Sequence, residues 1–531
     1  MSLTTSESDA APPPARTPSA EPSTAETTRT AGRGGLAIAV AKVSFIFFGF
    51  AQQAILPRLL GVDGYGEVSL VLSAVSVLNN VVVATSIQGV SRAVSQVPEA
   101  QADQALRRTL GVHAVLALVV SAAFAAMAGP IARFTAASQL TTQLRLVALV
   151  IFLYGIYAPL VGSLNGKRRF LDQAGLDIGY GALRLVAMVG GAMYFLHSGR
   201  GGVLGAVVGF IAAAAIIVPV ALVRSGTGKP GGTSPALGPY LRFLLPLAVS
   251  QYFLNQLMQT DLLFLSRFAG QAAGMTDAGI KAANSLRGVY RGVQLFAFLP
   301  FQLLMSVTFV LFPLLARASS EGDRVAVRSY TMTGVRLGFV LTGLMCGAVS
   351  GIAPHVLHLV FPEEIWTQGG DALRILSLGM GAFSVLGITC AALSGLGRPT
   401  AAAMLTALGV ALIATGCVVL IPRAELGPAM LVQAATATSI ALAITATAAG
   451  VVLHRTAGGF VAAATIVRVL GALGIAVAVG SRLPWLGKVF VPMEAAAVGV
   501  LYVVILVVMR ELGPADLARV LTVVRRKAPG A

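Results

Sequence analysis

Residues 203–223 read VLGAVVGFIAAAAIIVPVALV, without one charged side chain. A helix rises about 1.5 Å per residue, so roughly twenty such residues cross the ~30 Å hydrocarbon core of a bilayer. A spanning segment must also satisfy all its backbone hydrogen bonds internally, which a helix does. This stretch therefore predicts a transmembrane helix.

Similar apolar segments recur along the whole chain. With the first stretch extended to 201–223, they predict an all-α integral membrane protein with about fourteen transmembrane helices. An even number of spans places both chain ends on the same side of the membrane. The predicted spans are 35–56, 67–88, 110–131, 145–165, 175–197, 201–223, 241–265, 287–312, 331–353, 372–394, 400–421, 428–452, 459–480 and 490–510.

The composition excludes a water-soluble protein. Of 531 residues, 56% are hydrophobic and only 11% are charged, whereas a soluble domain carries about 25% charged residues. The net charge of +17 is attributed to basic loops rather than to a nucleic-acid partner, because no recognition motif accompanies it. The three cysteines lie in apolar segments without metal-ligand spacing, and no catalytic motif is present. We therefore expect no metal, no cofactor and no enzymatic activity.

The loops predict the orientation, because Lys and Arg collect in cytoplasmic loops. With both termini cytoplasmic, the opposite loops hold mostly single basic residues, such as Arg133, Arg200 and Arg423. The basic residues then assigned to the cytoplasm are Arg92, Arg107, Arg108, Lys167, Arg168, Arg169, Arg224, Lys229, Arg317, Arg324, Arg328, Arg398, Arg455, Arg519, Arg525, Arg526 and Lys527.

Two weak internal similarities predict a parallel repeat. The corner after the fourth span at Gly166 resembles the corner after the tenth at Gly395, and Arg92 after the second span corresponds to Arg317 after the eighth. Both pairs are separated by nearly the same number of residues, which relates spans 1–6 to spans 7–12. The predicted organisation is a disordered cytoplasmic tail (1–33), an N-lobe (34–223), a cytoplasmic linker (224–240), a C-lobe (241–452), spans 13 and 14 (453–512) and an amphipathic cytoplasmic tail (513–531).

Polar side chains inside the spans point to a functional site, because ionisable groups in a bilayer need water or a partner. In the seventh span three amides recur at every fourth residue and share one helix face. The first two spans of each lobe carry such faces, so facing lobes would enclose a hydrophilic cavity of cationic character. The predicted substrate-binding residues are Lys42, Gln53, Arg58, Asn80, Gln251, Asn255, Gln259, Lys281, Arg287 and Arg291.

Other interpretations remain open for several of these residues. Lys42 is close enough to the membrane edge to reach the headgroups instead. Arg287 and Arg291 would lie at the external interface instead if the eighth span begins later. The three amides could also join helices by hydrogen bonds.

Two aspartates have separate interpretations. Asp261 is either an ion-coupling residue or the ion-pair partner of Arg267 or Lys281. Asp177 and Arg184 lie seven residues apart on one face of the fifth span and are interpreted as a buried ion pair.

The corner PRLLGVDGYG at residues 57–66 is similar to the opening motif of the polysaccharide-transporter (Wzx-type flippase) branch of the multidrug/oligosaccharidyl-lipid/polysaccharide (MOP) exporter superfamily. Residues 282–315, the corner at 395–399 and Arg510-Glu511-Leu512 also resemble this family. The resemblance implies alternating-access transport of undecaprenyl-diphosphate-linked oligosaccharides across the cytoplasmic (inner) membrane. Its implied partners are the anionic lipid-linked oligosaccharide, membrane lipids and the polysaccharide polymerase machinery.

Two alternatives within the superfamily remain open. A lipid II flippase shares the fourteen spans and a basic cavity. A cation-coupled multidrug exporter would need carboxylates deep in one lobe, whereas the first two spans here carry Lys42 and no mid-span acid.

Overall fold

A computed structural model of the chain describes residues 24–229, 237–274 and 276–513. The predicted amphipathic tail after Gly513, most of the N-terminal tail and the centre of the 224–240 linker lie outside these residues. Helix α1 begins at Thr24, within the segment 1–33 for which we expected no regular structure.

The described residues form α-helices and short 3-10 helices without a strand, which confirms the all-α class. The α-helices are α1 (Thr24–Ser95), α2 (Ala102–Phe134), α3 (Thr141–Gly166), α4 (Phe170–His197), α5 (Gly202–Ser225), α6 (Leu237–Ala273), α7 (Asp277–Ala297), α8 (Leu299–Ser320), α9 (Arg324–Gly351), α10 (Ala353–Val360), α11 (Glu363–Gly395), α12 (Pro399–Leu420), α13 (Pro428–Ala457), α14 (Ala463–Gly480) and α15 (Val491–Val508).

Each predicted span corresponds to a helical segment. Eleven described helices are long and apolar enough to cross a membrane. One of them, α1, holds the first two spans, because Gly61 adopts φ 75° and ψ 165° and reverses the chain there. Such a positive φ is accessible to glycine without strain. Spans 7 and 8 lie on α6 and on α7–α8, outside those eleven, and both carry the polar side chains that drew attention in the sequence.

The eighth span differs from its prediction as one continuous segment. Its helix begins earlier, at Asp277, and is interrupted at Phe298 between α7 and α8. Pro300 occupies the first turn of α8. Proline lacks the N–H that would bond back to the preceding turn, and an apolar sequence pattern does not reveal such a break.

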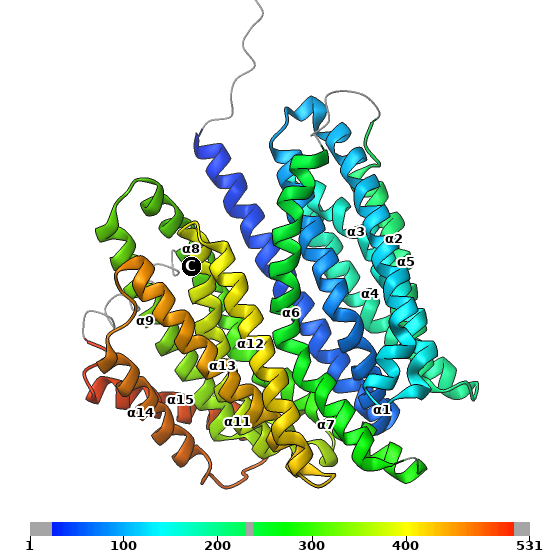
Figure 1. Cartoon of the computed structure of the whole chain (residues 1–531), viewed down its shortest axis with the longest axis vertical. Coiled ribbons are helices and arrows are strands. Elements are labelled where there is room, and N and C mark those ends of the chain that lie inside the picture. Colours follow the sequence, from blue (N-terminus) through cyan, green and yellow to red (C-terminus); the bar gives the residue numbers. More distant parts are fainter. Residues whose placement is uncertain (1–23, 230–236, 275, 514–531) are drawn as a thin grey trace, which may run out of the picture.

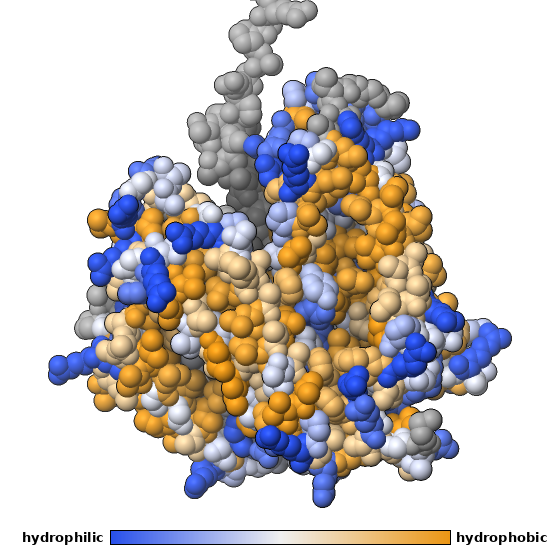
Figure 2. Space-filling model, viewed as in Figure 1, coloured by the Kyte–Doolittle hydropathy of each residue, from blue (hydrophilic) through white to orange (hydrophobic). Residues whose placement is uncertain are grey.

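The helices form two groups (Figure 1). Helices α1–α5 lie on one side and α8–α15 on the other, while α6 packs against both α1 and α12. We call the end where α1 reverses the Gly61 end, and the end where α3 finishes the Gly166 end; they are at the bottom and top of Figure 1. The surface is apolar around the middle and hydrophilic toward both ends (Figure 2). It is also hollowed between the two groups at the Gly166 end. This surface suits a membrane protein whose ends face water.

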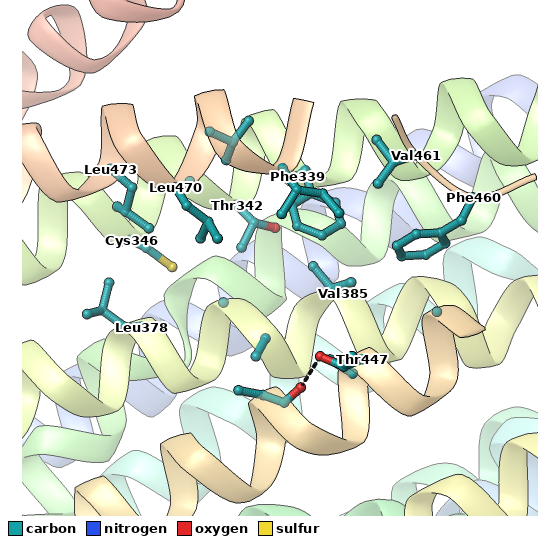
Figure 3. A pocket seen from close by; sticks show the side chains of 18 of the residues that line it. Phe339, Thr342, Cys346, Leu378, Val385, Thr447, Phe460, Val461, Leu470 and Leu473 are labelled. Carbon is teal, nitrogen blue, oxygen red and sulfur yellow. Dashed lines mark hydrogen bonds between the residues drawn. The ribbon is translucent and has the colours of Figure 1, made fainter. Parts of the chain in front are cut away.

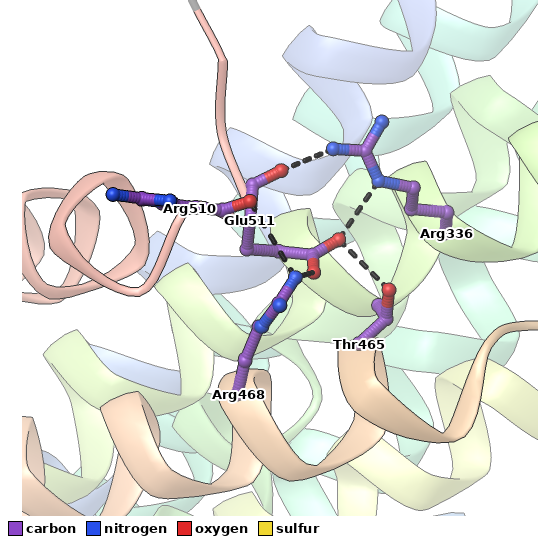
Figure 4. Close-up of polar contacts among 5 residues, drawn as sticks. All are labelled: Arg336, Thr465, Arg468, Arg510 and Glu511. Carbon is purple, nitrogen blue, oxygen red and sulfur yellow. Dashed lines mark hydrogen bonds and ion pairs between the residues drawn. The ribbon is translucent and has the colours of Figure 1, made fainter.

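The last two spans, α14 and α15, pack on α9. Side-chain contacts hold them to the other helices at both ends. At the Gly61 end the ring of His358 stacks between Trp366 at 4.4 Å and Trp485 at 4.3 Å. At the Gly166 end the Glu511 carboxylate is buried. It accepts bonds from Arg336 at 2.8 Å, Thr465 at 2.9 Å and Arg468 at 3.2 Å (Figure 4).

We expect Glu511→Gln to loosen this end of the bundle. Breaking a buried ion pair costs about 3–5 kcal/mol, and we expect the lower end of that range because the arginine side chains stay 38% and 39% exposed. Thermal unfolding in detergent measures the effect. The control is Glu321→Gln, which removes an exposed pair with Arg317 and should leave the unfolding temperature unchanged, because exposed ion pairs contribute little to stability.

The same carboxylate predicts a pH dependence. Burial alone would raise the pKa of Glu511, but the bonds from Arg336, Thr465 and Arg468 lower it below its usual value of 4.5. A lowered carboxyl pKa stabilises the fold above its unfolded-state value, and this contribution is lost as the pH falls through the folded-state pKa. Stability of the wild type should therefore decline below about pH 4.5, with a weaker decline in Glu511→Gln. Equal pH profiles would contradict this assignment.

Candidate functional site

The central polar layer is built by α6 and α7. The side chain of Asp261 on α6 is only 1% exposed. Its Oδ2 accepts a hydrogen bond from the Tyr290 hydroxyl at 2.8 Å. Its Oδ1 accepts from the Gln294 amide at 2.9 Å and from the backbone N–H of Leu262 at 2.8 Å. Three donors compensate the buried carboxylate, as burial requires.

This arrangement bears on one interpretation of Asp261 that the sequence left open, an ion pair with Arg267 or Lys281. Neither Arg267 nor Lys281 pairs with Asp261: the Arg267 guanidinium lies 4.7 Å from the centre of the Phe134 ring, and Lys281 is exposed. The carboxylate is held instead by the neighbouring helix α7. Whether it takes part in ion coupling stays a prediction.

Arg287 joins α7 to α6 and to the end of α2 near the Gly61 end. Its side chain is 1% exposed. Nη2 donates to the carbonyl of Thr135 at 3.1 Å, of Ala136 at 3.4 Å and of Ser266 at 3.1 Å, and Nη1 donates to Asn284. Thr135 and Ala136 follow α2, so the guanidinium caps the carboxyl end of α2. We call this set of bonds the Arg287 clasp. Whether Arg287 also binds substrate stays a prediction.

Next to this clasp, α1 and α7 approach without side chains between them. A Cβ atom built on Gly66 would lie 1.8 Å from the carbonyl oxygen of Asn284, and one built on Gly288 would lie 2.2 Å from that of Val62. The Asn284 amide also donates to the Glu67 carboxylate at 2.8 Å. The Gly61 end is thus closed by backbone contact as well as by polar bonds.

Arg291 lies one turn further along α7 and is partly exposed. Its Nη1 donates to the Gln294 side chain at 3.2 Å, and among the described residues it has no carboxylate partner in an ion pair. A guanidinium offers five donors, so most of its capacity remains available.

Two of the predicted amides connect α1 to α6. Asn80 on α1 donates to Asn255 on α6 at 2.8 Å, and Asn255 donates to the Gln251 carbonyl at 2.8 Å. The Gln259 side-chain oxygen is buried without a hydrogen-bond partner in the described part of the chain. Gln53 accepts a bond from Tyr65 at 2.8 Å within α1. The amide row therefore has both helix-joining and unpaired members.

Three predicted cations lie away from this row. Lys42, in the first half of α1, is within 3.5 Å of Asp177 on α4, with 63% of its side chain exposed. Arg58 is exposed near the reversal of α1 and donates to its own helix at the Ala54 carbonyl. Lys281 is exposed in the first turns of α7. Their roles in binding stay predictions.

The sequence analysis did not include Arg184 among the candidate site residues. We interpreted Arg184 as the partner of Asp177, but the recorded partner of Asp177 is Lys42. Arg184 instead lies with its guanidinium 4.6 Å from the centre of the Phe210 ring, and its Nε is buried without a hydrogen-bond partner among the described residues. The available signal was that Arg184 is the one Lys or Arg between residues 170 and 199.

A pocket of about 560 Å³ lies between α9, α11, α13 and α14 (Figure 3). Its walls are apolar, with Phe339, Leu378 and Leu473 among them, and His454 and Arg455 lie at the Gly166 end of α13. Its volume is within the range of small-ligand pockets. The pocket is therefore an apolar slot with basic side chains at one end.

The family model described as "Polysaccharide biosynthesis protein" matches residues 31–319, more than half of the chain. The chain belongs to this family. Its members within the MOP superfamily are membrane transporters, and the matched region includes α1, α6 and α7, which build the central polar layer. No curated protein matches the sequence closely.

Solved structures of the superfamily share the fold of this polysaccharide biosynthesis protein. A lipid II flippase MurJ in an inward closed conformation has a TM-score of 0.70 at 12% identity, covering 89% of this chain and 98% of the other. A MOP transporter from Pyrococcus furiosus, described as having a binding pocket of reversed polarity, has a TM-score of 0.57 at 15% identity, covering 80% and 96%. An inward-facing multidrug-resistance MATE transporter has a TM-score of 0.57 at 15% identity, covering 76% and 95%. These TM-scores show a common fold, whereas identities of 12–15% leave the substrate open.

Proposed function

We propose that this protein flips undecaprenyl-diphosphate-linked oligosaccharide units across the cytoplasmic membrane for polysaccharide synthesis. The observation that carries the proposal is the cation Arg291, held in the central polar layer next to amides and without a carboxylate partner in the described residues. A diphosphate cannot cross hydrocarbon unaided. A guanidinium supplies charged donors that suit its oxygens, and amides such as Gln259 suit sugar hydroxyls.

The lipid part of the substrate places different demands on the protein. An isoprenoid chain is stable in the bilayer, so the protein needs to guide only the headgroup. The apolar pocket bounded by Phe339, Leu378 and Leu473 suits part of a hydrocarbon chain. This combination favours an amphiphilic substrate over a compact soluble one.

We propose the orientation that the basic loops predict. The Gly166 end, with Lys167, Arg168, Arg169 and Arg398, then faces the cytoplasm, and the closed Gly61 end faces outside. In this orientation the headgroup enters from the cytoplasm. Sugars from nucleotide donors are attached to the lipid carrier on that side. The closed Gly61 end prevents leakage while the headgroup binds.

The lipid II flippase alternative has one specific observation in its favour. The MurJ structure gives the TM-score of 0.70 and covers 89% of this chain, compared with 0.57 and 76% for the MATE transporter. A multidrug exporter is less suitable, because the Asp177 carboxylate near the N-lobe surface is already paired with Lys42.

Complementation separates these functions. The chain is expressed in a panel of strains that lack polysaccharide flippases of different repeat units, and in a strain depleted of its lipid II flippase. We expect restored polysaccharide export in at least one of the first group and no rescue of the second. Rescue of the second alone would reassign the protein to peptidoglycan synthesis, and rescue of none, with protein in the membrane, would contradict the proposal.

The same assay tests the central cation. A hydrogen bond to a charged group is worth about 1.5–3 kcal/mol, so Arg291→Gln should reduce export about 10–100-fold. The matched control is Arg145→Gln on α3, whose side chain is exposed and should be dispensable. Equal export by both variants would remove Arg291 from the site.

A further inference from the structure

A further pocket, of about 430 Å³, lies where α6 meets α1 and α2. Its walls come from the second half of α1, from α2 and from the first turns of α6, and most of the lining side chains are aliphatic. Leu116 on the α2 wall is 41% exposed and Leu245 on the α6 wall is 68% exposed. Exposed aliphatic side chains of a membrane helix contact lipid tails. This pocket, which we call the α2–α6 groove, is therefore open to the hydrocarbon of the bilayer.

The floor of the α2–α6 groove is a polar bridge that needs no ligand. The buried ring of His113 is bonded through Nδ1 to the Ser86 hydroxyl at 2.9 Å and through Nε2 to the Tyr240 hydroxyl at 2.7 Å. Thr85 donates to the Val81 carbonyl of its own helix at 2.6 Å. Because these polar groups are already paired within the protein, the space above them suits an apolar group.

Two guanidinium groups lie toward the Gly166 end of this groove. Helix α6 begins at that end (Figure 1), and Arg242 in its second turn is exposed and lines the groove. Arg92, also exposed, lies near the Gly166 end of α1, with its guanidinium 4.2 Å from the centre of the ring of Phe243, the residue after Arg242. Among the described residues neither arginine forms an ion pair with a carboxylate. The groove is thus apolar along its length and cationic at one end.

This combination matches the chemistry of an acidic phospholipid. An acyl chain suits the aliphatic walls, and a guanidinium binds phosphate oxygens through charge-assisted hydrogen bonds. Basic pockets between transmembrane helices recognise anionic headgroups on the cytoplasmic side. In the orientation proposed above, the Gly166 end faces that leaflet, whose surface is anionic. A soluble phosphate would leave the apolar walls unused, so a lipid is favoured.

The groove borders the part of α6 that is docked on α1 and α2. Helix α6 packs against both α1 and α12, and its first turns contribute Tyr240 and Leu244 to a small apolar core with Ala93 of α1. The approach is close, since a Cβ atom built on Gly89 would lie 2.5 Å from Cδ2 of Leu244. A chain lying in the groove contacts α2 and α6 together, and it therefore favours the arrangement in which the start of α6 is docked.

We propose that the α2–α6 groove binds one acyl chain of an acidic phospholipid from the cytoplasmic leaflet, with Arg242 and Arg92 at its phosphate. The bound lipid holds the start of α6 against α1 and α2. This site is separate from the central polar layer around Asp261, and it serves the protein whichever headgroup is transported. The lipid acts as a regulator, because the docked and undocked positions of α6 differ in their affinity for it.

The test is thermal unfolding of the full-length protein in mixed micelles, with phosphatidylglycerol replacing phosphatidylcholine at constant total lipid. A ligand that binds the folded state raises the unfolding temperature as its concentration rises. We expect phosphatidylglycerol to stabilise the wild type and Arg242→Gln to need about tenfold more of it for the same shift, since a hydrogen bond to a charged group contributes about that factor. The matched control is Arg398→Gln, which removes an exposed arginine next to α12 and should keep the wild-type response.

A second pair of variants tests the acyl chain. Ala248 lines the groove, so Ala248→Trp fills it while Arg242 stays in place, and most of the response to phosphatidylglycerol should be lost. Ala122→Trp, at an exposed position of α2 outside the groove, is the control and should respond as the wild type does. Each variant is compared with its own unfolding temperature in phosphatidylcholine, so a change in intrinsic stability does not obscure the result.

Several results would overturn the proposal. Equal stabilisation of the wild type by both lipids would show no preference for an acidic headgroup. Equal losses in Arg242→Gln and Arg398→Gln would indicate general attraction to a basic protein, and a full response in Ala248→Trp would remove the acyl chain from the groove. Stabilisation by farnesyl diphosphate but not by phosphatidylglycerol, lost in Ala248→Trp, would assign the groove to the transported lipid instead.

Discussion

Replacement of Arg287 by glutamine is expected to abolish transport and to leave the Gly61 end unable to stay closed. The Arg287 guanidinium bonds to the carbonyls of Thr135, Ala136 and Ser266, which come from the end of α2 and from α6. Ser266 lies inside α6 and keeps its helical backbone bond, but the carbonyls of Thr135 and Ala136 lie beyond the end of α2 and lose this donor. Each carbonyl left unpaired in a buried place costs about 1–3 kcal/mol. The variant therefore loses several kcal/mol of stabilisation specifically in the closed arrangement.

Lysine should not rescue this position. Arg287→Lys retains the charge, but an ammonium at the end of a flexible stem does not reproduce the planar fork that reaches carbonyls on two helices. We expect Arg287→Lys to retain at most a small part of the wild-type transport. Arg133→Gln, an exposed arginine at the same end of α2, is the matched control and should transport normally.

Opening of the Gly61 end has a direct readout. Ala137, at this end of the bundle, is fully buried, so a cysteine introduced there should resist a membrane-impermeant thiol reagent in the wild-type background. In the Arg287→Gln background we expect rapid labelling at equal protein abundance. Continued protection of that cysteine, together with normal transport, would show that Arg287 does not close this end.

The sequence predicts the spans well because apolar length is a local property. Each of the fourteen segments follows from about twenty consecutive residues, whatever the rest of the chain does. Even the exception is local in origin: Pro300 divides the eighth span into α7 and α8, and a proline at that position could have suggested a break.

Partners of the polar residues are harder to predict because they are not local. Asp177 and Arg184 do share a face of α4, but Lys42 from α1 takes the carboxylate. Asp261 is likewise held by Tyr290 and Gln294 of the next helix rather than by the nearby Arg267. Spacing along one helix identifies which residues share a face, whereas the packing of helices decides which of them meet.

The same limit applies to Arg287 and Arg291. They lie on successive turns of α7, on the same helix face, and have the same chemistry, so the sequence assigned them one role. The structure separates them, since Arg287 is enclosed by backbone carbonyls while Arg291 bonds to a single amide. Replacing both together would therefore mix loss of closure with loss of binding.

Alanine at Gly66 or Gly288 is expected to eliminate most transport, although it adds a single methyl group. The added Cβ would lie 1.8 Å from the Asn284 oxygen in the first case and 2.2 Å from the Val62 oxygen in the second. Carbon and oxygen atoms of packed helices approach no closer than about 3.3 Å. Because both obstacles are backbone atoms, no side-chain rotation relieves the clash, and α1 and α7 must move apart by more than about 1 Å.

The effect of alanine on helix propensity is opposite in sign to the expected loss of transport, so the two effects can be told apart. Alanine in place of glycine favours a helix by up to about 1 kcal/mol, so a loss of function at Gly66 or Gly288 cannot come from a weaker helix. Gly179→Ala and Gly190→Ala on α4 are the matched controls, since no atom lies within 4 Å of the new Cβ at either position. Both controls should transport normally and unfold no earlier than the wild type.

Thiol labelling at position 137 and transport together decide the outcome. Small residues let membrane helices pack backbone to backbone, and the contact between Gly66 and Gly288 lies beside the Arg287 clasp. If this contact closes the Gly61 end, Gly66→Ala should expose the cysteine at position 137 just as Arg287→Gln does. Normal transport and a protected cysteine in Gly66→Ala would mean that α1 and α7 need not touch during the transport cycle, and closure would then rest on the Arg287 bonds alone.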